Sequence, residues 1–165
     1  MSGDLPDFHI PHAEKIEWMI ETNGWAIEVV PPRQDTDPPT PGYTYTIGFP
    51  ERFGFPEVVV FGLTPADSRG LLDLVTALFG ADQEIPFGVP VLGVYDGEQR
   101  CVFAPVDLDE WQDLFPTAVA WHRGNGFAVV QMLWPDRAGW LPYEEGYDPR
   151  FVVTQPVIGA VDRWG

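Results

Sequence analysis

Two apolar runs joined by a proline-containing segment occupy the middle of the chain. Tyr43, Tyr45 and Ile47 alternate with two threonines, which is the period of a strand with one buried face. Residues 49–56 contain two prolines and a glycine, so we expect a loop there. Residues 58–61 (VVVF) are continuously apolar, which is typical of a central strand covered on both faces. The pattern therefore predicts two neighbouring strands at the centre of a sheet.

Helical periodicity appears on both sides of these strands. Residues 13–23 carry apolar side chains on one face, and Gly24 supplies a stop signal. Thr64 and Pro65 suit the cap and first position of a helix, and an apolar stripe at helical spacing follows them. We therefore expect helices over residues 13–23 and 65–80, with shorter helical segments after Asp107 and over residues 118–123.

The remaining apolar runs predict further strands over residues 25–30, 89–95, 100–106, 127–134 and 151–158. Asp96-Gly97 is a hairpin turn signal between the second and third of these. Residues 1–12 are expected to form an extended arm, and the proline-rich residues 31–42 an exposed loop. Together these elements predict an α+β fold in one domain, residues 1–165, with a mixed or mainly antiparallel sheet of about five to seven strands and two or three packed helices.

Composition and charge restrict the classes of function. The 165 residues, 45% of them hydrophobic, suffice for one folded domain. The 25 acidic and 9 basic residues give a net charge of −16, which disfavours nucleic acid. This charge favours a basic protein partner or serves solubility alone, and solubility is the more common reason for it. No apolar run is long enough to cross a membrane, the first residues do not resemble a signal peptide, and Cys101 is the only cysteine. We therefore expect a cytoplasmic protein; its oligomeric state is not predicted.

Residues with catalytic chemistry do not form a recognisable motif. Cys101 lies in a strand-like run, which indicates a buried structural thiol, and neither serine lies in a nucleophile motif. His9 and His12 could form part of a metal site with nearby aspartates, but no third histidine is close in sequence. His122 lies near the expected end of a helix, where a cationic imidazole suits the dipole. We therefore assign no catalytic and no metal-binding residue, and no cofactor is predicted.

Polar residues within and beside apolar strands are the remaining candidates for function. A small-molecule site combines aromatic walls with a few convergent polar groups. If the strand ends meet, one pocket at one end of the sheet is built from Tyr45, Arg52, Glu57, Gln131, Trp134 and Asp136. The alternative is structural: Gln131 bonds to the backbone of a loop, and Asp136 caps a turn.

Several motifs are similar to one known family. Tyr45-Thr46-Ile47-Gly48 and the later block from Gln131 to Asp136 resemble the domain-of-unknown-function 4262 family. That resemblance implies a bacterial domain without an agreed activity. The order of strand, glycine, loop and Pro-Glu strand is also similar to suppressor-of-fused-like domains, which occur as immunity proteins in bacterial toxin systems. Together with the charge, this favours a binding module, in its sharper form an immunity-like protein that captures a basic partner. The alternative is a small enzyme or small-molecule binder that uses the aromatic pocket.

Overall fold

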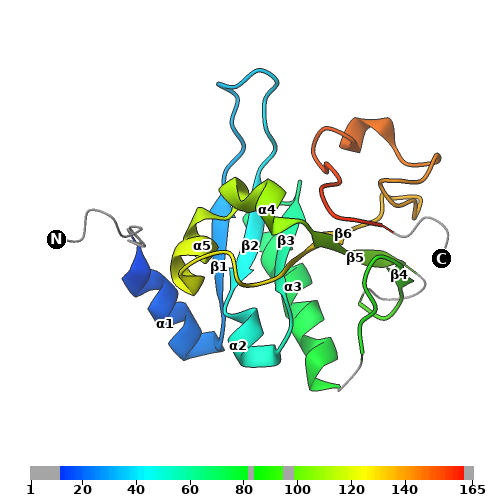
Figure 1. Ribbon diagram of the computed structural model, residues 1–165. Helices are drawn as coiled ribbons and strands as arrows, with labels where there is room; N and C mark the ends of the chain where they lie inside the picture. The colour runs from blue at the N-terminus through cyan, green and yellow to red at the C-terminus, as the bar shows by residue number, and fades with distance from the viewer. Residues whose placement is uncertain (1–11, 82–83, 95–98, 162–165) are drawn as a thin grey trace.

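A computed structural model describes residues 12–81, 84–94 and 99–161 of the chain (Figure 1). Its centre is a six-stranded sheet with the order β1-β2-β3-β6-β5-β4. The strands are β1 (Ala26–Val30), β2 (Tyr43–Ile47), β3 (Glu57–Phe61), β4 (Pro90–Val91), β5 (Cys101–Val106) and β6 (Val129–Leu133). β3 and β6 are parallel, and the other neighbours are antiparallel. The α+β class and the mixed sheet expected from the sequence are confirmed.

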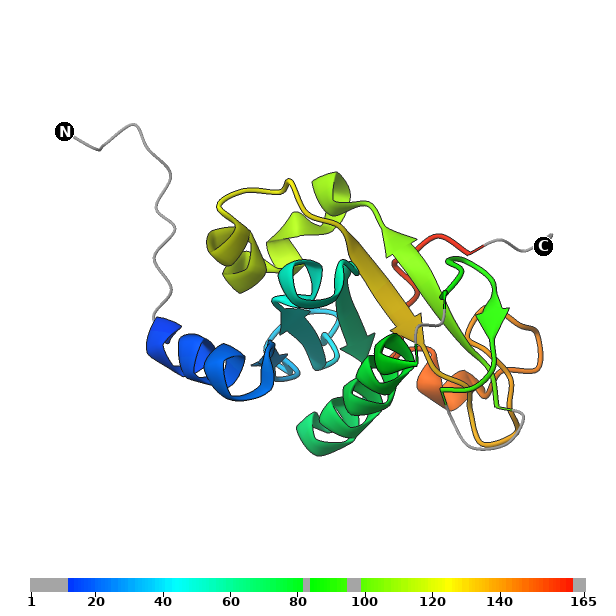
Figure 2. The ribbon, with the colours of Figure 1, turned by 90° about the horizontal axis from the view of Figure 1, so that it is seen from below.

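The sheet is covered on both faces because its central strands are apolar on both. Alternate residues of β3 point to opposite sides: Val59 belongs to one apolar cluster and Val58 to another. α4 (Leu108–Trp111) and α5 (Pro116–His122) cover the Val59 side, and α3 (Pro65–Gly80) covers the Val58 side, as Figure 2 shows. All five residues of β3 are buried; the apolar run over residues 58–61 predicted this for four of them, and Glu57 is the fifth. α1 (Ala13–Asn23) lies beside β1.

Local signals placed both ends of α1 and the starts of α3 and α4 correctly. α1 has the predicted bounds, and Gly24 closes it in the left-handed conformation at φ 87°. The Thr64 hydroxyl accepts a hydrogen bond from the backbone N–H of Asp67, which caps α3. Asp107 caps α4 in the same way by accepting from the Asp109 N–H. α5 begins at Pro116, two residues before the predicted start, since proline fits the first turn of a helix.

The predicted loop over residues 49–56 is wrong in part, because a short helix, α2 (Phe49–Phe53), forms there. Pro50 is compatible with a first helical turn. The backbone N–H groups of Gly48 and Phe49 at the helix start both donate to the Glu57 carboxylate. The helix is thus stabilised by a side chain beyond its own sequence, and local proline and glycine signals did not show it.

The predicted strand over residues 151–158 is also wrong. A 3-10 helix, η2 (Pro149–Phe151), and irregular chain take its place, and Gly159 alone makes an isolated bridge, to Val106. The predicted strand over residues 89–95 is reduced to β4, which pairs with β5; residues 95–98, with the Asp-Gly turn, lie outside the described residues. Residues 31–42 extend beyond the sheet as an exposed hairpin (Figure 1).

Three further expectations concern Cys101, membrane-spanning segments and His9. Cys101 is completely buried, and burial raises the pKa of its thiol to about 12, so the thiol is structural. Within the described ranges, no helix is both long enough and apolar enough to span a bilayer. His9 lies outside the described residues.

Candidate functional site

Glu57 is a buried carboxylate at the start of central strand β3. Its side chain is 1% exposed and accepts hydrogen bonds from the Thr46 hydroxyl at 2.7 Å and the backbone N–H groups of Gly48 and Phe49 at 2.8 and 3.1 Å. A buried carboxylate needs such donors, because an unpaired charge in the interior is costly. The three donors come from β2 and the turn into α2, so they fix Glu57 in one orientation.

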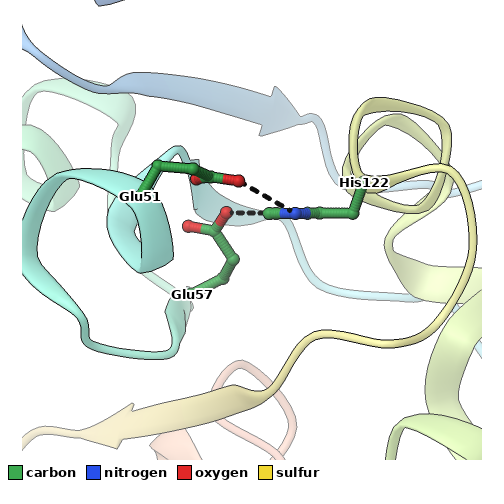
Figure 3. Close-up of side chains that lie close together, drawn as sticks. All are labelled: Glu51, Glu57 and His122. Atoms are coloured by element: carbon green, nitrogen blue, oxygen red, sulfur yellow. Dashed lines mark hydrogen bonds and ion pairs between the residues drawn. The ribbon is translucent and has the colours of Figure 1, made fainter.

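His122 lies opposite this carboxylate at the end of α5. The helix ends there because Arg123 adopts the left-handed conformation at φ 57°. The imidazole is 9% exposed; Nε2 lies 2.8 Å from Glu57 and Nδ1 lies 3.3 Å from Glu51 (Figure 3). The face of the ring stacks on Phe127 at 4.3 Å between centroids. Two carboxylates from α2 and β3 therefore flank one imidazole whose ring plane is fixed.

The two ring nitrogens have different roles in this arrangement. An ionised carboxylate only accepts hydrogen bonds, so the short contact with Glu57 places a proton on Nε2. Nδ1 then faces the Glu51 carboxylate, and a neutral imidazole would bring two acceptor atoms together there. A second proton or a metal ion between Nδ1 and Glu51 removes that conflict. Orientation of a histidine through its far nitrogen is typical of metal ligands and of general bases.

A hollow of about 290 Å³ adjoins this cluster. Glu51 lies in its wall and is 60% exposed, so this carboxylate is accessible from solvent. The hollow is lined by Ile20, Gly24, Gly48, Glu51, Arg52 and Trp121.

The six predicted site residues do not meet in one pocket. Glu57 lies at the first residue of β3, whereas the Trp134 indole N–H donates to the carbonyl of Phe61 at its last residue. At about 3.3 Å per residue, these ends are roughly 13 Å apart. Asp136 follows Trp134 at the far end, and Gln131 pairs with the middle of β3 at Val59. A small-molecule site or enzyme therefore cannot depend on a pocket built from all six.

The contacts of these residues are largely structural. Tyr45 is buried, which raises its pKa, and its hydroxyl accepts a hydrogen bond from the Thr117 N–H. Arg52 is exposed, lies over the ring of Phe53 and lines the hollow beside Glu51. Gln131 bonds to the backbone of residues 156–159, which is the structural alternative considered from the sequence.

Asp136 organises the turn after β6. Its carboxylate accepts from the backbone N–H groups of Ala138, Trp140 and Asp148. Burial opposes its charge, but the backbone donors outweigh burial and hold the pKa of Asp136 below its ordinary value.

The lowered pKa of Asp136 predicts acid sensitivity. A carboxyl group with a lowered folded pKa contributes fully above its unfolded value of about 3.9 and loses that contribution as the pH falls through the folded pKa. We expect the difference in free energy of unfolding between wild type and Asp136→Asn to shrink between about pH 5 and pH 2. Urea denaturation at several pH values measures it. If the difference in unfolding free energy between the two proteins stays constant with pH, the negative charge of Asp136 does not stabilise the turn.

A second imidazole–carboxylate pair lies on the same side of the molecule. His12 Nε2 is 2.7 Å from Glu28 on β1, and the Thr117 hydroxyl also donates to Glu28. This pair connects the start of α1 to β1 and the start of α5. His12 contacts one carboxylate, whereas His122 contacts two.

Sequence reasoning included Glu57 but missed Glu51 and His122 as site residues. The sequence predicted a loop at Glu51, which lies in α2 instead, and correctly predicted His122 near the end of a helix. Their positions are 71 apart in the printed sequence, and no spacing motif connects them. Glu51 and His122 meet because the fold brings α2 and α5 to the same end of β3 (Figure 3).

The fold and this cluster define a small α+β domain with a histidine–carboxylate site at one end of a mixed sheet. The chain belongs to the family described as "Domain of unknown function (DUF4262)", whose model matches residues 19–148. The matched range contains all three residues of the cluster. Searches of curated proteins and of solved structures found no match.

Proposed function

We propose that this protein is a binding module that holds a divalent transition-metal ion between His122 and Glu51. The main support is the position of the His122 imidazole between two carboxylates, with its Nδ1 directed toward Glu51. One ligand atom from each of Glu51, Glu57 and His122 can be chosen so that all three lie within 4.8 Å of one another. Imidazole and carboxylate together suit zinc and its first-row neighbours better than calcium or magnesium.

The separation of the two proposed ligands supports this assignment. Zn²⁺ binds imidazole nitrogen and carboxylate oxygen at about 2.0–2.2 Å, so two such ligands at a tetrahedral angle are about 3.4 Å apart. Nδ1 of His122 and the Glu51 oxygen are 3.3 Å apart. The ion would therefore fit between them without a large movement of either side chain.

Glu57 is better suited to orient the histidine than to bind the ion itself. Three other donors already occupy its two oxygens. Its contact with Nε2 is the outer carboxylate contact that commonly sets the orientation of a metal-binding histidine. The remaining coordination positions would face the hollow and take water or a donor atom from a ligand.

Titration calorimetry with ZnCl₂ tests the proposal. We expect one Zn²⁺ per chain, and we expect Glu51→Gln to weaken binding by at least about tenfold because it removes a charged ligand. Glu51 is exposed, so this variant should keep the wild-type melting temperature. Co²⁺ substitution adds a spectroscopic check, since tetrahedral Co²⁺ with a nitrogen ligand absorbs strongly in the visible range.

Two matched controls separate this site from the rest of the chain. His12→Gln removes the other described imidazole–carboxylate pair, and Glu145→Gln removes an exposed charge elsewhere. Both should bind Zn²⁺ like wild type. Absent binding, or equal weakening in Glu51→Gln and Glu145→Gln, would contradict the proposal and leave His122 as a structural residue that joins α2, β3 and α5.

We also propose that the domain is cytoplasmic. The free, buried thiol of Cys101 and the absence of any other cysteine in the sequence support a reducing compartment.

A further inference from the structure

Two adjoining hollows form a groove at the end of the sheet opposite Glu57. The first, of about 540 Å³, lies between the exposed hairpin of residues 31–42 and Val153. The second, of about 350 Å³, lies between the start of α3 and Trp134. Leu63 lines both, so the two hollows adjoin at the chain that leaves β3.

The groove is apolar and open to solvent. Val153 is 68% exposed and Leu74 is 44% exposed, although both are aliphatic. Three prolines of the hairpin extend the same surface: Pro32, Pro39 and Pro41. Exposed aliphatic side chains that line a hollow can pack against an apolar side chain of a partner.

The groove wall is held by close backbone packing. Gly62 has φ 83°, and a Cβ atom there would lie only 2.7 Å from the carbonyl oxygen of Thr154. The chain after β3 and the C-terminal segment therefore touch directly at the floor of the groove. A preformed wall lowers the cost of ordering on binding.

The charge of the groove selects the partner. Asp67, exposed in the first turn of α3, is the single charged side chain that lines either hollow within the described residues. No described lysine or arginine lines it, and the whole chain carries a net charge of −16. Such a field attracts a basic partner and repels an acidic one.

We infer that this groove binds an extended segment of a basic protein. An aliphatic or aromatic side chain of the segment packs between Leu63 and Val153, and a lysine or arginine pairs with Asp67. The basic partner predicted from the charge of the chain thus receives a docking surface that is separate from the histidine–carboxylate site.

Selection from a displayed library of random twelve-residue peptides on the immobilised full chain tests this inference. We expect enriched peptides to combine an apolar residue with lysine or arginine. For a synthetic peptide of that consensus, Val153→Asp should weaken binding at least about tenfold and Asp67→Asn about three- to tenfold. Both positions are exposed, so these variants should fold normally.

Leu92→Asp is the matched control, because it introduces the same charge at a similarly exposed aliphatic residue, 61% exposed, that does not line the groove. It should bind the peptide like wild type, and so should Glu51→Gln, which disables the proposed metal site alone. No enrichment, acidic consensus peptides, or equal weakening by Leu92→Asp and Val153→Asp would overturn the inference. Sedimentation of wild type as a dimer that Val153→Asp dissociates would also overturn it, since a second copy would then occupy the groove.

Discussion

Replacing Glu57 with alanine should lower the free energy of unfolding by about 3–5 kcal/mol, the cost of breaking a buried hydrogen-bonded ion pair. The carboxylate is 1% exposed and receives four contacts, from Thr46, Gly48, Phe49 and His122. Its removal leaves two backbone N–H groups and a hydroxyl without their partner, and each unsatisfied buried group costs roughly 1–3 kcal/mol. α2 and the end of α5 lose their common attachment to β3 at the same time.

Urea denaturation followed by tryptophan fluorescence measures this loss. Glu51→Ala is the matched control, since Glu51 also contacts His122 but is 60% exposed, and we expect it to change stability by no more than about 0.5 kcal/mol. Equal losses of unfolding free energy in the two variants would show that the burial of Glu57 does not determine how much it stabilises the fold. A loss below about 1 kcal/mol for Glu57→Ala would contradict its role as the attachment point.

Replacing Gln131 with leucine should release the C-terminal segment from the sheet. The Gln131 Oε1 accepts from the N–H groups of Ile158 and Gly159 at 2.8 and 3.1 Å, and Nε2 donates to the carbonyl of Pro156 at 2.6 Å. The amide therefore satisfies three backbone groups of the C-terminal segment. Leucine has similar size but no polar atoms, so three backbone groups lose their partner. We expect a loss of about 2–4 kcal/mol, limited because the segment can detach and bond to water.

Hydrogen exchange at the amides of Ile158 and Gly159, together with urea denaturation, measures this effect. Exchange should accelerate strongly at these two amides in Gln131→Leu and remain slow in β3, which lies in the buried centre. Gln112→Leu makes the same chemical change at an exposed position and should leave both observables unchanged. Unaltered protection of the two amides in Gln131→Leu would show that other contacts hold the segment.

Gln131 and Glu57 also show why part of the secondary structure was predicted incorrectly. The apolar residues between positions 151 and 158 have strand-like composition, but a 3-10 helix covers Pro149–Phe151, and the backbone N–H groups of Ile158 and Gly159 donate to a side chain of β6. The reverse happened at residues 49–53, where a helix forms because a carboxylate of β3 accepts its first N–H groups. In both places a distant polar side chain decided the backbone conformation, and local propensity is a weak guide where tertiary contacts intervene.

The sequence by itself determined the α+β class, the bounds of α1, the caps of α3 and α4, and the two buried central strands. Each of these depends on neighbours within a few residues, or on apolar periods that burial imposes on the chain. It also determined the net charge, and with it the kind of partner we propose.

The tertiary structure alone decided which polar residues meet. Strand order placed Trp134 and Asp136 at one end of β3 and Glu57 at the other, which divided the predicted pocket. The same order brought Glu51 and His122 together at the Glu57 end. Contacts between residues far apart in sequence depend on how the sheet is assembled, and no local pattern in a single chain specifies that order.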